Sequence, residues 1–180
     1  MDNAKVLLPR EIDLDKCITA NARYDSARIE LTDIPRLLES VVRVEGPVVA
    51  TISFERDLNS MRLVKGTAEA DVVLVCERCN EEFVQHLCLD FVLTPDYERA
   101  KACNLLEKYE FIEFTDSGKI DLYDIIEDGL ILEIPAFPRH DEDDPACSRE
   151  GSSWSYGEVA PEAQENPFAA LAALKGNLKQ

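Results

Sequence analysis

The sequence lacks the features that mark several large classes of protein. Among its 180 residues, no apolar run approaches the roughly 18 residues that a membrane-spanning helix needs. Residues 1–9 have neither the basic start nor the long apolar core of a secretory signal peptide. We therefore expect a cytoplasmic protein that has no contact with a membrane.

Positive charge is also scarce. The chain has 19 Lys and Arg residues against 36 Asp and Glu residues, so its formal net charge is −17, and no basic run occurs. Phosphate backbones repel such a surface, which argues against free-standing binding to nucleic acid. A basic protein is the partner that this charge attracts best, although the acidity could equally serve solubility alone.

Catalytic motifs are missing as well. The sequence contains no glycine-rich phosphate loop, no Gly-x-Ser-x-Gly and no His-Glu-x-x-His. Its many carboxylates form no pattern of a nucleophile with its base. We predict that the protein is not an enzyme and assign it no catalytic residue.

A series of strand patterns is present. Val48–Glu55 alternates apolar and polar residues, as a half-buried strand does. Further strands are expected at 24–31, at 61–76 with a bulge at Gly66, and from 83 to about 93. Short turns between them favour an antiparallel meander. The predicted fold class is α+β, with an antiparallel sheet that could curl toward a barrel.

The strongest helix pattern lies in the C-terminal half and runs from Asp121 to Ile134. Asp121 can cap its N-terminus, and Pro135 ends it. Gly129 costs about 1 kcal/mol relative to alanine inside a helix, which suggests a close contact at that point. The apolar face that we expect to pack on the sheet consists of Leu122, Ile125, Ile126 and Leu130.

Smaller elements are expected around this core. A short helix should begin at Thr32–Pro35, with a capping side chain and then proline in the first turn. Residues 5–8 and 110–114 could each add an edge strand. These elements would extend the sheet and cover part of it.

The composition changes after Pro138. We divide the chain into an α+β core domain, residues 1–138, and an extended acidic tail, residues 139–180, that ends in a short helix. Asn166 would cap this helix and Pro167 would occupy its first turn. A helix this short is marginal unless it docks on a core or a partner. Its apolar stripe, which we predict to bind a partner, consists of Phe168, Leu171 and Leu174.

Six cysteines in a cytoplasmic protein favour thiols or metal ligands over disulfides. Cys76 and Cys79 stand between two strand patterns, so their thiols should project near a hairpin tip and could form half of a tetrahedral zinc site. His140 and Cys147 could complete a closed Cys3His site with a structural role. Alternatively, the cysteines could pack as small apolar residues. A redox dithiol is a third reading, but such a pair is expected at a helix N-terminus.

The remaining polar residue of this motif is Arg78, between the two cysteines. It could bind an anion or a carboxylate of a partner. We favour an internal pair with Glu77, Glu81 or the acidic loop 141–144. The other three cysteines have no paired spacing and are expected to be ordinary thiols.

Four motifs occur in a characteristic order: Cys76–Cys79 after an apolar strand, Ile120–Leu132, Pro135–His140 and Asn166–Lys175. In this order the chain resembles, over nearly its whole length, the YceD family of large ribosomal RNA subunit accumulation proteins. The resemblance implies a role in synthesis, processing or stability of 23S ribosomal RNA and no known catalytic activity. The matching positions that we expect to contact a partner are Arg78, Asp121, Glu127, Asp128, Asn166, Pro167 and Phe168.

Three functions are therefore considered. The first is a non-enzymatic ribosome-biogenesis factor that binds ribosome-assembly proteins, most readily basic ones, and reaches ribosomal RNA indirectly. The second is a direct RNA-binding protein with a local basic patch, and the third is an enzyme, either a nuclease or a redox protein. The net charge argues against the second and the missing motifs against the third, so we favour the first.

Overall fold

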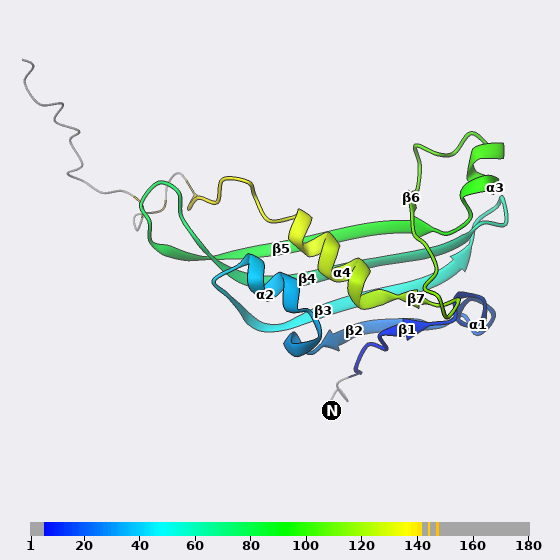
Figure 1. Ribbon diagram of the computed structural model, residues 1–180, viewed down its shortest axis with the longest axis horizontal. Coiled ribbons are helices and arrows are strands. Elements are labelled where there is room, and N and C mark those ends of the chain that lie inside the picture. Colours follow the sequence, from blue (N-terminus) through cyan, green and yellow to red (C-terminus); the bar gives the residue numbers. More distant parts are fainter. Residues whose placement is uncertain (1–5, 142–143, 145–146, 148–180) are drawn as a thin grey trace, which may run out of the picture. The chain divides into compact units, whose positions relative to one another are not determined.

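The computed structural model describes residues 6–141, 144 and 147. Its centre is a five-stranded sheet of order β2-β3-β4-β5-β6 (Figure 1). The first four strands form an antiparallel meander, and β6 pairs in parallel with β5. The α+β class is confirmed, and the described sheet does not close into a barrel. The strands are β2 (Arg23–Ile29), β3 (Arg43–Arg56), β4 (Arg62–Val75), β5 (Glu82–Thr94) and β6 (Glu110–Phe111).

The expected bulge at Gly66 is wrong. Gly66 pairs with Ile52 on one side and Phe91 on the other, without a shift in register. A Cβ at this position would lie 2.7 Å from the Thr51 carbonyl oxygen and 2.7 Å from the Phe91 ring. Glycine is therefore needed here because a backbone and a ring approach the strand closely.

Helices α2 and α4 lie over one face of the sheet (Figure 1). The alternating apolar residues of the strands point to these helices and form the main core, as the strand pattern predicted. The described residues contain the helices α1 (Leu14–Thr19), α2 (Pro35–Ser40), α3 (Tyr97–Ala102) and α4 (Leu122–Leu132), and a 3-10 turn, η1 (Leu31–Asp33), precedes α2.

Helix α4 confirms the expected helix, but it begins one residue later and ends at Leu132, two residues before the expected Ile134. Asp121 caps it by accepting hydrogen bonds from the backbone N–H groups of Tyr123 and Asp124, at 3.0 and 3.1 Å. A Cβ at Gly129 would overlap the side chain of Leu89 on β5, so the expected close contact exists. On the predicted apolar face, Leu122, Ile126 and Leu130 are fully buried, and Ile125 is half-buried.

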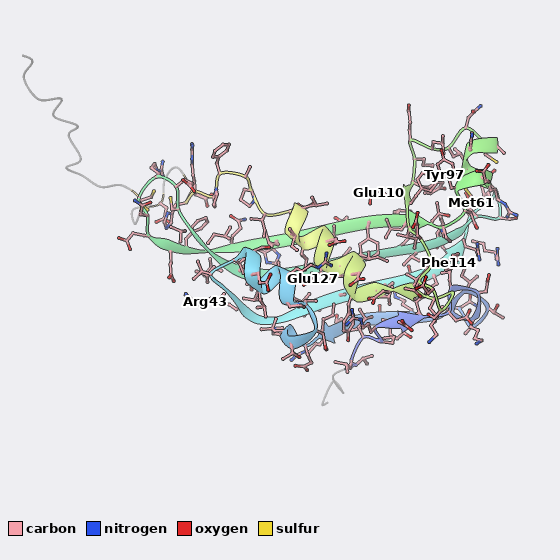
Figure 2. All side chains as sticks on the ribbon, viewed as in Figure 1. Arg43, Met61, Tyr97, Glu110, Phe114 and Glu127 are labelled. Carbon is pink, nitrogen blue, oxygen red and sulfur yellow. The ribbon has the colours of Figure 1, made fainter. Side chains whose placement is uncertain are left out.

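Helix α2 starts at Pro35, but the expected side-chain cap from the preceding residues is wrong. Ile34 occupies the N-cap position, and its apolar side chain accepts no hydrogen bond. The buried Glu127 of α4 accepts from the Leu37 N–H at 3.0 Å instead (Figure 2). A free N–H group at a helix start needs an acceptor, and here a neighbouring helix supplies it.

Two strand pairings join distant parts of the chain. Strand β1 (Glu11–Ile12) pairs antiparallel with β7 (Ile120–Asp121), directly before α4. The strand expected at 5–8 reduces to a bridge between Leu7 and Arg28, beside β2. Within the part of the chain that the structure describes, no helix is long and apolar enough to cross a bilayer.

Candidate metal centre

Cys76 and Cys79 lie in the tight turn that joins β4 to β5. The Cys76 N–H donates to the Glu81 carbonyl at 2.9 Å, and the Asn80 N–H donates to the Cys76 carbonyl at 2.9 Å. Asn80 has a φ of +59°, a left-handed conformation that asparagine adopts more readily than most residues. The turn thus holds both thiols at the hairpin tip, as the spacing predicted.

The chain after α4 returns to this tip. The Pro138 carbonyl accepts from the Glu77 N–H at 2.9 Å, which fixes the segment beside the turn. Successive turns then bring Cys147 back: the Asp144 N–H donates to the Asp141 carbonyl, and the Cys147 N–H to the Asp144 carbonyl. Backbone contacts, rather than side chains alone, place the second pair of candidate ligands.

The four candidate ligands converge. One ligand atom from each of Cys76, Cys79, His140 and Cys147 lies within 4.8 Å of the other three. The Cys76 and Cys147 sulfurs are 3.7 Å apart, and the Cys79 sulfur is 3.5 Å from Nδ1 of His140. Ligands bound tetrahedrally at zinc distances would be about 3.8 Å apart for two sulfurs and about 3.6 Å for sulfur and nitrogen. We call these four residues the metal centre.

The metal centre is enclosed by protein. All four residues are buried, and the Phe83 ring packs on the His140 ring with their centroids 4.7 Å apart. Four protein ligands fill a tetrahedral shell and leave no position for substrate. The donor set therefore fits a structural ion, and a pair of cysteines between two strands differs from the helix N-terminus expected for a redox dithiol.

The thiols of the metal centre differ in their acidity. Burial opposes ionisation of Cys76, but backbone N–H groups of His140, Arg78 and Cys79 outweigh it and lower its pKa to about 5. Burial, together with the neighbouring sulfurs, raises the pKa of Cys79. Thiolates this close together repel one another. A divalent ion bound between them would offset this repulsion by its positive charge and would keep the thiols deprotonated.

Arg78 belongs to the metal centre's surroundings. Its Nε donates to the Cys147 sulfur at 2.8 Å, and its Nη2 lies 3.4 Å from the Asp141 carbonyl. Its backbone N–H donates to the Cys76 sulfur at 3.4 Å. Internal pairing was expected with acidic side chains as the partners, whereas the sulfurs of Cys76 and Cys147 were not expected in this role.

Other predicted contact residues have roles inside the protein. Asp121 caps α4 and pairs with Arg10 at 2.9 Å, while Glu127 is buried against α2. Asp128 is exposed and pairs with Arg36 at 2.5 Å. Their binding to a partner stays a prediction. The tail residues Asn166, Pro167, Phe168, Leu171 and Leu174 lie outside the described residues, as does most of the predicted tail domain.

The family model and the known protein that match this sequence belong to the same family. The family model described as large ribosomal RNA subunit accumulation protein YceD matches residues 64–175, which include the whole metal centre. The large ribosomal RNA subunit accumulation protein YceD of Haemophilus influenzae is 38% identical over 175 residues, covering 95% of this chain and 98% of that protein. No solved structure matches the chain.

Proposed function

Because the chain belongs to the YceD family, we propose that it supports the accumulation of large-subunit (23S) ribosomal RNA in the cytoplasm. The observation that carries this proposal is the similarity to a protein of that name along almost the full length of both chains. Such coverage makes a shared role far more plausible than similarity of one motif would.

We propose further that the protein acts through contacts with other proteins and not by chemistry on RNA. Its charge of −17 gives no counterion-release gain from phosphates, whereas it attracts basic proteins, which ribosome assembly requires in number. The proposed metal centre is closed and offers no catalytic position. Association steered by such an attraction is fast, and the attraction weakens as salt is added.

The metal centre, in this proposal, holds one structural zinc ion. Thiolate and imidazole are the ligands that zinc prefers, and the distances between them already suit a tetrahedral ion. The ion would join the β4–β5 turn to the segment after α4.

The zinc proposal is tested by elemental analysis of the purified chain, with about one zinc per chain expected. Cys79→Ser should lose the metal, whereas Cys88→Ser, at an exposed cysteine of β5, should keep it. Cobalt in place of zinc should give the absorption of a tetrahedral thiolate complex. A metal content below a tenth of an ion in protein prepared without chelator would refute the proposal.

The cellular role is tested by removing the protein from its host and comparing large- and small-subunit ribosomal RNA. We expect less large-subunit RNA, because its accumulation needs this factor. An unchanged ratio under all growth conditions would end the proposal. Capture of basic assembly proteins at low salt supports the protein-contact mechanism, and tight, salt-resistant binding of naked RNA would contradict it.

A further inference from the structure

Three arginines gather at the end of the sheet opposite the metal centre: two flank the β3–β4 turn, and the third comes from the distant helix α3. Arg56 ends β3, Arg62 begins β4, and Arg99 lies on α3. Together with Asp15 and Asp96 they line a cavity of about 220 Å³. Figure 1 shows α1 and α3 at this end and the β4–β5 turn at the other. We call Arg56, Arg62 and Arg99 the arginine cluster.

The carboxylates of the cavity do not balance the arginine cluster. Asp96 pairs with Arg62 at 2.5 Å, and Asp15 pairs with both Arg56 and Arg62, at 3.0 and 3.1 Å. Arg99 has no carboxylate within 4.0 Å among the described residues. Three positive charges thus face two negative ones among the residues that line the cavity, and Asp96 interacts electrostatically with Arg99 as well as with Arg62.

The guanidinium groups are held in place. The Ser60 carbonyl accepts from Nη1 of Arg99 at 2.6 Å and lies 3.4 Å from Nη1 of Arg56. Ser60 has a φ of +60°, the left-handed conformation, in the turn that presents this carbonyl. Arg62 also lies over the Phe114 ring, 5.4 Å from its centroid. The cluster is thus preorganised, so a ligand would not have to order it.

The cluster keeps donors for a further ligand. A guanidinium has five N–H donors, and the bonds to Asp15, Asp96 and Ser60 use fewer than half of those in the cluster. Guanidinium groups match the oxygens of phosphate with paired hydrogen bonds. No basic run exists in the sequence, because the three arginines meet only after β3, β4 and α3 have packed.

We propose that the arginine cluster binds a phosphate group. The group could be free inorganic phosphate or a phosphate of an RNA chain; the RNA case rests on the proposed function. A protein needs many phosphate contacts to hold RNA tightly against salt, and one cluster supplies few. The site would therefore orient RNA that a protein partner has already brought close, and it would not capture naked RNA strongly.

The test is a titration of the full-length protein with sodium phosphate, followed by NMR and compared with sodium chloride at equal ionic strength. We expect saturable shifts, with binding about tenfold weaker in Arg99→Gln and in Arg56→Gln, since each removes a charged donor. Arg43→Gln is the matched control, because Arg43 (labelled in Figure 2) begins the strand that Arg56 ends, and the two side chains are 52% and 46% exposed.

A single-stranded oligoribonucleotide, with and without a 5′ phosphate, identifies the source of the group. Competition between oligonucleotide and phosphate assigns the site to RNA, and phosphate binding alone assigns it to the free ion. No saturable phosphate binding by the unmodified protein, or an equal loss in Arg43→Gln, overturns the proposal. Urea unfolding of each variant shows that the fold is intact. The ribosomal RNA ratio of the deletion strain tests the proposed function separately, whatever the phosphate result.

Discussion

The carboxylate of Glu127 should contribute more to stability than any other acidic group of α4. It is the point where α4 holds α2: Glu127 accepts from the Leu37 N–H at 3.0 Å and from Nε of Arg36 at 3.1 Å. Its side chain is 4% exposed, whereas that of Arg36 is 49% exposed. We predict that Glu127→Ala destabilises the fold strongly without affecting the metal centre.

The size of this effect follows from the two interactions. Leaving the buried Leu37 N–H without an acceptor costs about 1–3 kcal/mol. The ion pair with the half-exposed Arg36 adds no more than about 0.5–1 kcal/mol, because water screens it. The expected loss is about 2–3 kcal/mol, equivalent to a fall of about 5–10 °C in Tm for a chain of this size. Glu127→Gln keeps one acceptor and should lose about half as much.

Urea unfolding measures this loss, and Asp128→Ala is the control. Asp128 also pairs with Arg36, but its side chain is 58% exposed and accepts no buried N–H. Its removal should cost less than about 1 kcal/mol. Equal losses in Glu127→Ala and Asp128→Ala would refute the reasoning, because they would show that the Leu37 N–H does not depend on Glu127.

Three other substitutions test separate features. Gly66→Ala places a Cβ against the Thr51 carbonyl and should cost about 1–3 kcal/mol in urea unfolding; a more stable variant would contradict the close contact. Arg78→Met should weaken zinc binding about tenfold in chelator competition, because a positive charge beside three thiolates is lost, and Arg43→Met should leave affinity unchanged. Burial opposes ionisation of Asp57, but hydrogen bonds in its turn outweigh burial and hold its pKa below the ordinary value. Its contribution to stability is thus present above the unfolded-state pKa and is lost as pH falls through the folded-state pKa, so Asp57→Asn should flatten the acid limb of the stability curve.

Local patterns were enough to predict the meander and α4. The buried face of β3 is visible as alternation in its sequence, and that of α4 as apolar residues at helical spacing. Both patterns involve only residues that are close in sequence. The parallel pairing of β6 and the β1–β7 ribbon were not predicted, because their partners are distant in sequence. Strand β6 confirms part of the edge strand expected at 110–114, but pairings of two residues are too short to indicate which strand is the partner.

The same contrast applies to functional residues. The members of the metal centre could be proposed because the chain has only six cysteines and two histidines. Few sets of four metal ligands can be chosen from so small a number. The arginine cluster and the cap of α2 could not, because arginine and glutamate are common in this chain. Only the contacts made by Arg99 and Glu127 in the fold distinguish them from the many other charged residues.

The order of the strands has a consequence for synthesis of the protein. Residues 23–94 carry β2 to β5, so a growing chain can pair each strand with the one just made, at a small cost in loop-closure entropy. Helix α4, at residues 122–132, emerges later, and until then only α2 of the two covering helices is present, so part of the apolar face of the sheet contacts water. Released chains that end before residue 120 should therefore bind chaperones or aggregate, whereas the full-length chain should not.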